Sequence, residues 1–417
     1  MSTHSPTSPT RKADPGLISL DFILLFFMAL FSNCYLSIYY CFEQWLEHVS
    51  VDPSWRGILL GALFGMVLVT RPFATVIMLK RSRLPAVIVS LFICSGVLFS
   101  YQFLDPASPS FEWLLLALRI VQGIFLAIYS SCVVSVLVSC IPPGQSARGF
   151  ALFSFTTLLP YAIIPTIGEF LLPIVGSEPS LFAWTSLLLV PCLVMSFFLA
   201  PRLRQTDAAV AGRTANFAQY RKDLMHSVLH SGLSLVFASM FSFSLATSTG
   251  LFFMKGLCSQ TGGDPAKFFF YYTTTMIVLR FFFSKRLDTL PRYRIVPIVA
   301  LTMASGLLII AWGPLWAYVP ATILYGISLS LLYPLTAAAI YDRSTPETRT
   351  INSNFMMLMF DAGGLFSPMI GGFVISLGLD YHAVITVAAG MVSMSGFFFT
   401  LDRLRLHLQE VRARRQA

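Results

Sequence analysis

LALRIVQGIFLAIYSS, residues 116–131, places a single arginine inside a long apolar segment. No other charge occurs between Trp113 and Cys140, a run long enough to cross a bilayer as a helix. A charged side chain at the centre of a bilayer costs roughly 2.5–3.5 kcal/mol on insertion scales. Arg119 is therefore either a packing residue held by polar groups, or it faces an aqueous cavity. In a cavity it would bind an anionic group or tune a nearby carboxylate.

The composition of the whole chain also indicates a membrane protein. Of 417 residues, 56% are hydrophobic and only 11% are charged, against about 25% charged in a typical soluble domain. Apolar segments of helical spanning length recur along the chain, so we predict an all-α integral membrane protein with twelve transmembrane helices. The predicted spans are 18–45, 55–78, 84–104, 111–140, 147–173, 180–200, 227–254, 266–285, 294–313, 315–340, 349–376 and 380–401.

The basic residues distinguish the two sides of the predicted membrane. With the N-terminus in the cytoplasm, the residues that fall outside are Arg56, Lys255 and Lys267. Those that fall within spans are Arg71, Arg119 and Arg280, and the other 22 of the 28 Lys and Arg residues face the cytoplasm. This asymmetry follows the positive-inside rule. It predicts a multi-pass protein with both termini cytoplasmic, and it assigns the net charge of +9 to the anionic inner leaflet rather than to nucleic acid. No N-x-S/T sequence occurs, which is compatible with our expectation of a bacterial inner membrane.

The longest predicted internal loop divides the chain into two halves. We expect a disordered tail at 1–17, a six-helix bundle at 18–200, a linker at 201–226, a second six-helix bundle at 227–401 and a basic tail at 402–417. Both tails and the linker are expected to be cytoplasmic.

The two predicted bundles share a sequence repeat. Gly123, Pro165 and Gly168 match Gly326, Pro368 and Gly371 at one constant offset, and Arg71 aligns with Arg280. Duplicated bundles around a midplane site are typical of secondary transporters.

Several motifs resemble those of the major facilitator superfamily (MFS), over nearly the whole chain. RIVQG (119–123) matches the fourth-span motif R-x-x-Q-G. PTIG (165–168) resembles the fifth-span motif G-P-x-x-G-G of proton-driven exporters, with Ile164 and Glu169 in place of two glycines. The loop motif between spans eight and nine keeps Ser284, Asp288, Pro291 and Arg292, whereas Leu79 replaces the aspartate in the first half. The resemblance implies an alternating-access transporter of the drug or metabolite proton antiporter branch, with no enzymatic activity.

Polar faces on several spans are candidate substrate-binding surfaces. Residues 33, 37, 40 and 44 recur at helical spacing on the first span. The family resemblance implies that spans one, four, seven and ten line the cavity. The predicted substrate-binding residues are Arg119, Asn33, Ser37, Tyr40, Gln122, Tyr129, Tyr325 and Tyr333. The alternative for such polar side chains is helix–helix packing.

Three acidic residues are candidate proton carriers. Glu169 and Glu43 lie near the outer ends of spans five and one, and Asp361 lies in the middle of span eleven. A carboxylate balanced between desolvation and a nearby positive charge can load and release a proton. We rank Glu169 first and Glu43 second; the alternative for both is a solvated interfacial acid.

Arg71, Arg280 and Asp288 are candidate gating residues between the halves. The resemblance implies that spans two and eleven meet, so an Arg71–Asp361 bridge would hold one conformation and break in the other. Arg280 is a second candidate partner of Asp361. The alternative is that each charge is satisfied within its own half.

No cofactor or metal site is expected. His226 and His230 have the i, i+4 spacing of a metal pair but no evident third ligand, so we assign them to the membrane interface. The predicted protein is a monomer whose partners are a small-molecule substrate, protons and the lipid bilayer. Its predicted function is proton-coupled export of a small organic solute. The alternatives are proton-coupled uptake or facilitated diffusion of a nutrient, metabolite or siderophore-like solute, and, from other classes, an integral-membrane enzyme or a channel.

Overall fold

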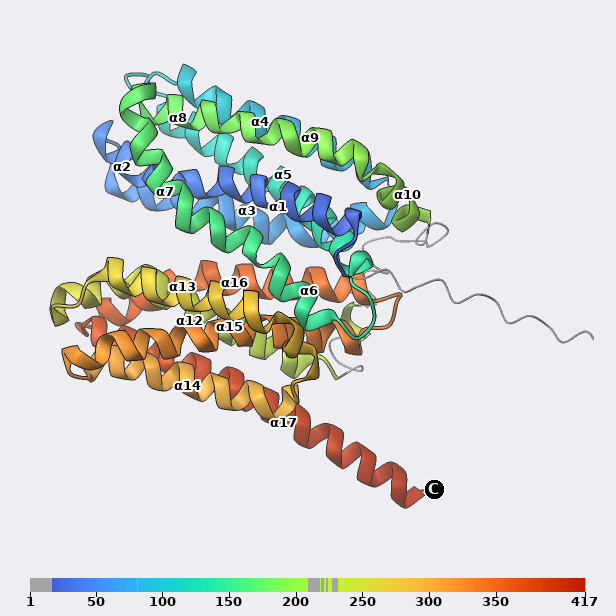
Figure 1. Cartoon of the computed structure of the whole chain (residues 1–417). Coiled ribbons are helices and arrows are strands. Elements are labelled where there is room, and N and C mark those ends of the chain that lie inside the picture. The colour runs from blue at the N-terminus through green and yellow to red at the C-terminus, as the bar shows by residue number, and fades with distance from the viewer. Residues whose placement is uncertain are drawn as a thin grey trace, which may run out of the picture.

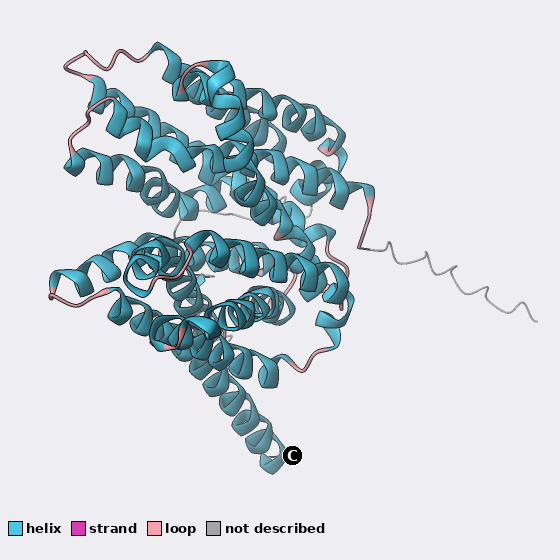
Figure 2. Cartoon of the chain, turned by 60° about the vertical axis from the view of Figure 1, so that its left-hand side comes forward, coloured by secondary structure: helices cyan, strands magenta, loops and turns pink. Residues whose placement is uncertain are grey.

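The computed structural model describes residues 17–80, 82–208, 218, 221–222, 224–226 and 232–416. Within these ranges every regular element is a helix (Figure 2). The elements of the first half are α1 (Leu20–Ser37), η1 (Ile38–Cys41), α2 (Phe42–His48), α3 (Pro53–Lys80), α4 (Arg83–Ser100), η2 (Tyr101–Phe103), α5 (Phe111–Cys140), α6 (Ser146–Phe153), α7 (Phe155–Val175), α8 (Glu178–Thr185), η3 (Ser186–Leu188), α9 (Leu189–Phe198) and α10 (Ala200–Ala208). Those of the second half are α12 (Ser234–Thr261), α13 (Pro265–Phe283), η4 (Ser284–Thr289), α14 (Arg292–Trp312), η5 (Leu315–Ala317), α15 (Tyr318–Arg343), α16 (Arg349–Ser376) and α17 (Tyr381–Gln416).

The described helices form two bundles, one from α1–α9 and one from α12–α17 (Figure 1). Ten candidate spans are long and apolar enough to cross a membrane. Helices α7, with 21 residues, and α13, with 19, pack beside them and bring the number of spans to twelve. The predicted all-α fold with twelve spans is therefore confirmed, while the bundle boundaries predicted from the sequence stay predictions.

Local sequence explains where several helices begin and end. The Asp264 side chain accepts hydrogen bonds from the backbone N–H groups of Ala266 and Lys267, and Pro265 occupies the first turn, so α13 begins there. Helices α12 and α7 are each followed by a capping glycine, Gly262 and Gly176, with φ of 73° and 85°. Glycine adopts this left-handed conformation at no steric cost.

The sequence repeat is matched by equivalent close contacts in the two bundles. A Cβ atom added to Gly123 on α5 would lie 2.7 Å from the Leu63 carbonyl oxygen on α3. A Cβ atom added to Gly326 on α15 would lie 2.8 Å from the Tyr272 carbonyl oxygen on α13. Span four thus packs on span two as span ten packs on span eight, because glycine lets the backbones approach.

Several predicted spans differ from their observed form. The fifth, predicted over 147–173, is divided into α6 and α7, and the sixth, predicted over 180–200, consists of α8, η3 and α9. The first, predicted as one helix over 18–45, is interrupted by the 3₁₀ turn η1 between α1 and α2. The last, predicted to end at 401, continues as α17 to Gln416 and projects beyond the bundle (Figures 1 and 2). The predicted C-terminal tail is therefore helical through residue 416.

Candidate functional site

We call the end of the molecule that carries the loops around Lys80, Arg148, Arg286 and Arg343 the basic end. The other end is called the opposite end. The candidate site is built from side chains that join the two bundles.

An ion pair joins the bundles in the middle parts of α3 and α16. Arg71 on α3 donates from Nε and Nη2 to Asp361 Oδ2 on α16, at 2.8 and 2.6 Å. The Arg71 side chain is 6% exposed and that of Asp361 is 22% exposed, while Arg71 Nη1 is buried with no hydrogen-bond partner. The predicted contact between these residues is confirmed, and the alternative that each is satisfied within its own half is wrong for this pair.

Arg280 does not pair with Asp361. Its guanidinium donates to the carbonyl oxygens of Ser330 and Leu329 on α15, at 3.2 and 3.1 Å, and to the Ser154 hydroxyl of the other bundle. The repeat explains the difference, because Leu158 stands 203 residues before Asp361, at the same offset that relates Gly123 to Gly326. With no carboxylate at that position, carbonyl and hydroxyl oxygens satisfy the buried cation.

Tyr333 lies beside both arginines. Its ring packs against Phe360, the residue before Asp361, with ring centroids 5.7 Å apart. It also lies on α15 one helical turn after Leu329 and Ser330, whose carbonyl oxygens bind Arg280. We call the midplane cluster the set of four residues with two positive charges and one negative charge, namely Arg71, Arg280, Tyr333 and Asp361.

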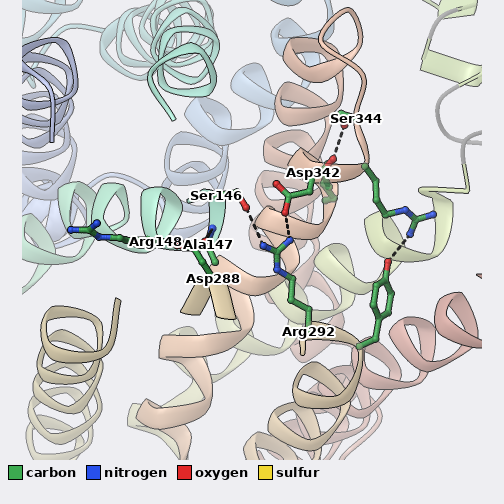
Figure 3. Close-up of polar contacts among 10 residues, drawn as sticks. Ser146, Ala147, Arg148, Asp288, Arg292, Asp342 and Ser344 are labelled. Atoms are coloured by element: carbon green, nitrogen blue, oxygen red, sulfur yellow. Dashed lines mark hydrogen bonds and ion pairs between the residues drawn. The ribbon is translucent and has the colours of Figure 1, made fainter. Parts of the chain in front are cut away.

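Asp288 joins the bundles at the basic end (Figure 3). Its Oδ1 accepts hydrogen bonds from the backbone N–H groups of Ala147, at 2.8 Å, and Arg148, at 3.3 Å, in the first turn of α6. A carboxylate at a helix N-terminus is stabilised by otherwise unpaired N–H groups and by the helix dipole. Burial raises the pKa of Asp288, against the effect of these hydrogen bonds and of nearby Arg292.

Three consecutive residues at the end of α15, Tyr341, Asp342 and Arg343, lie in the same region. The Tyr341 hydroxyl lies 2.9 Å from the Ile141 carbonyl oxygen of the other bundle. Asp342 accepts from Arg292, whose Nη2 lies 3.1 Å from the Ser146 hydroxyl on α6 (Figure 3). Arg343 pairs with Asp402 on α17. These three residues were not among the predicted site residues. An acid beside an arginine at the end of a helix, close to a basic loop such as that at 292, indicates ion pairs and is visible in the sequence.

Among the residues that the structure describes, every hydrogen bond and ion pair that we find between the bundles lies in the half of the molecule toward the basic end. The bundles meet there at α6, η4 and α15 (Figure 1). The basic end is therefore closed in this conformation, and we call these contacts between the bundles at the basic end the gate.

Arg119 does not face an open cavity. The residue is 3% exposed, and its guanidinium carbon lies 3.9 Å from the ring centroid of Tyr39 and 3.6 Å from that of Phe42. Its Nε has no hydrogen-bond partner. The expectation of a cavity-facing arginine is wrong for this conformation, because stacking on two aromatic faces offsets the cost of burying the charge.

Most other predicted substrate-binding residues pack within one bundle. The Asn33 and Ser37 side chains bond to carbonyl oxygens of their own helix. The buried Gln122 accepts from the Tyr39 hydroxyl at 3.0 Å, the Tyr129 hydroxyl donates to Met28, and Tyr325 packs between Phe268 and Tyr272. Of the predicted substrate-binding residues whose side chains the structure describes, only Tyr333 belongs to the midplane cluster. A substrate-binding role for the others stays a prediction.

Some predicted residues cannot be placed. The side chains of Tyr40, Glu43, Gln44 and Glu169 lie outside the described part of the structure, although their backbones belong to helices. The proton-carrying role of the two glutamates therefore stays a prediction. His230 also lies outside the described residues, and within the described part of the chain no group of three His, Cys, Asp or Glu residues could hold a metal ion.

A family model described as Major Facilitator Superfamily matches residues 21–264 and 268–415. The chain belongs to this family. As a member of the superfamily with this fold, it is a secondary transporter and an integral membrane protein. No curated protein sequence matches it.

Solved structures with the same fold include three transporters of distant sequence. The human organic anion transporter MFSD10 (TETRAN) has a TM-score of 0.71 at 16% identity, covering 93% of this chain and 100% of that one. The transporter FucP in the outward conformation has a TM-score of 0.69 at 13% identity, covering 93% and 99%. A bacterial homologue of the iron transporter ferroportin, in the outward-facing state, has a TM-score of 0.72 at 13% identity, covering 92% and 100%. At such identities the likeness shows the fold alone.

Proposed function

We propose that the protein exports a small organic solute in exchange for protons, by alternating access with the basic end in the cytoplasm. The ion pair between Arg71 and Asp361 is the observation that carries this proposal. The pair joins α3 of one bundle to α16 of the other, so it persists only while the bundles are together at this level. Opening the basic end must separate the two charges.

Separation of the pair links opening to protonation. Once Arg71 moves away, ionised Asp361 is a partly buried carboxylate without its partner, and desolvation then favours the protonated form. A proton that arrives from the opposite end, binds an Asp361 carboxylate oxygen and neutralises it therefore releases Arg71 and allows the basic end to open. Loss of that proton to the cytoplasm restores the charge, and the renewed attraction to Arg71 closes the basic end and carries bound solute outward.

Direction rests on the fifth-span sequence PTIG (165–168), which resembles a motif of proton-driven exporters. The distribution of basic residues supports a cytoplasmic basic end. We propose a monomer because both partners of every contact that joins the bundles come from this one chain. Glu169 and Glu43 stay the alternative proton carriers.

Proton-coupled uptake is the second candidate. Structures sharing this fold include an E. coli fucose:proton symporter and a proton:xylose symporter. A midplane cluster with a titratable carboxylate serves either direction, so only transport measurements distinguish them.

The test uses purified protein in liposomes with a pH gradient imposed in each sense, and solutes selected by thermal shift of the detergent-purified protein. We expect an exporter to move solute against the direction of proton flow, and Asp361→Asn to abolish gradient-driven accumulation while sparing counterflow. Glu169→Gln and Glu43→Gln test the two alternative carriers, and both should retain accumulation if Asp361 carries the proton. Solute movement in the same sense as the protons would support uptake. Accumulation by Asp361→Asn would overturn the assignment of the proton to Asp361.

A further inference from the structure

Helix α17 is too long to be only a membrane span. Its 36 residues extend about 54 Å at 1.5 Å per residue, whereas the hydrocarbon core of a bilayer is about 30 Å thick. The helix begins at Tyr381 at the opposite end, so roughly 20 residues bring it to the basic end near Leu401. The remaining segment, residues 401–416, which we call the arm, projects beyond both bundles (Figures 1 and 2).

The base of the arm is fixed to the end of α15, beside the gate. The Asp402 side chain is fully buried and pairs with Arg343. Arg343 also bonds to the Tyr293 hydroxyl at 3.1 Å and to the Gly232 carbonyl oxygen at 2.9 Å. These contacts set the direction in which the arm leaves the bundle, so its faces have a defined orientation.

The arm has an apolar stripe that nothing in the described structure covers. Leu401, Leu404, Leu408 and Val411 follow one another at spacings of three and four residues, which places them on one face of the helix. Leu404 is 53% exposed and Leu408 is 49% exposed. A shallow open hollow on this face is lined by the leucines at 401, 404 and 408 together with Arg405, Gln409 and Arg412.

The charge of the arm identifies what would cover the stripe. Arg403, Arg405, Arg412 and Arg414 are opposed within the arm by Glu410 and by Asp402, whose charge is already paired with Arg343. A helix with an apolar stripe flanked by arginines suits the boundary between acyl chains and headgroups, where the arginine charges stay in the headgroup layer. The helix also emerges from a membrane span at the level of the headgroups, on the side with the basic loops.

We propose that the arm, which leaves the bundle obliquely (Figure 1), leans against the headgroup layer of the membrane at the basic end and binds anionic phospholipids there. The stripe faces the bilayer, and the arginines bind the phosphate groups. The arm thereby becomes a lipid-binding site whose base is joined, through Arg343, to the residues that close the gate.

The test measures hydrogen–deuterium exchange of the full-length protein in nanodiscs of phosphatidylcholine alone or mixed with phosphatidylglycerol. In the anionic discs we expect exchange over residues 401–416 to slow on the order of tenfold or more, because each arginine near an anionic surface adds to binding. High salt should remove most of the difference.

Charge-matched variants make the test specific. The triple variant Arg405→Gln, Arg412→Gln, Arg414→Gln should lose the lipid dependence, whereas Lys285→Gln, Arg286→Gln, Arg294→Gln, which removes three basic residues elsewhere on the same side, should keep it. Leu404→Gln with Leu408→Gln should weaken protection in both discs. The proposal is overturned if exchange of the arm is equal in both discs. It is also overturned if protection appears only in discs holding two copies, since a second copy would then cover the stripe.

Discussion

At the scale of single residues, the buried arginine of span four is stabilised by aromatic rings. Arg119 stacks on Tyr39 and Phe42, and the Tyr39 hydroxyl donates to Gln122. The two rings come from η1 and from the first residue of α2, at the interruption of the first span. A short 3₁₀ segment inside a helix often marks a hinge, so the stack fastens the outer part of that span to α5.

The Tyr39 ring and its hydroxyl can be separated by mutation. Tyr39→Phe keeps the stack and removes one hydrogen bond, so it should lower the free energy of unfolding by about 0.5–1.5 kcal/mol. Tyr39→Leu should cost a further ~1–2 kcal/mol, because the face over the buried guanidinium is lost. Denaturant unfolding of the detergent-purified protein measures both. Equal losses for the two variants would mean that the hydroxyl, not the ring, carries the stabilisation.

Sequence reasoning reached the buried charges and the pairing of Arg71 with Asp361, but not the surroundings of Arg119. Isolated Arg71, Arg119 and Asp361 stand out in apolar runs because each is costly in a membrane. The partners of Arg119 depend on side-chain direction and on where a helix breaks. Tyr39 and Phe42 reach Arg119 only because the chain turns at η1, and no feature of the local hydrophobic pattern signals that turn.

At the scale of elements, the spans were predictable because they depend on local features of the sequence. These are the length of each apolar segment and the proline, glycine and charged residues at its ends. Gly123 and Gly326 also mark real close contacts, since the repeat preserves the same packing in both bundles. The α17 arm was missed because its arginines resemble a solvated tail, while its leucines at helical spacing are few.

Helix α6 is held by a residue of the other bundle, and this contact predicts the behaviour of the gate. Asp288→Ala would leave two N–H groups in the first turn of α6 without their acceptor, at a cost of about 1–3 kcal/mol to the closed form. The alkylation rate of a cysteine introduced by Ala147→Cys should then rise by roughly 5- to 100-fold, because Ala147 is buried only while the gate is closed.

Asp288→Asn is the matched control for the gate. The amide keeps an acceptor oxygen and avoids the burial cost that raises the pKa of the Asp288 carboxyl, so the labelling rate should stay close to that of the parent. A second control, Asp380→Asn, changes an exposed acid at the opposite end and should have no effect. Identical rates for the Ala and Asn variants would show that the cap does not hold the gate.

At the scale of the whole molecule, two similar bundles are joined by unequal contacts. The Arg71–Asp361 pair has no ionic equivalent at the positions related to it by the repeat. Leu158 occupies the position that corresponds to Asp361, and Arg280, which corresponds to Arg71, bonds to neutral oxygens. Asp288 likewise has no acidic counterpart at Leu79. The asymmetry leaves Asp361 as the one carboxylate of the midplane cluster, which is the residue that our proposed mechanism protonates.

The central claim is that the Arg71–Asp361 pair keeps the basic end closed until Asp361 is protonated. Its most direct test is the distance between spin labels at positions 143 and 285, which are exposed residues of opposite bundles at the basic end, measured by pulsed EPR in nanodiscs over a pH series. We predict that the unmutated labelled protein shifts from short to long distances as the pH falls, and that Asp361→Asn populates both short and long distances in proportions that do not change with pH. Short distances alone at every pH in Asp361→Asn would contradict the account.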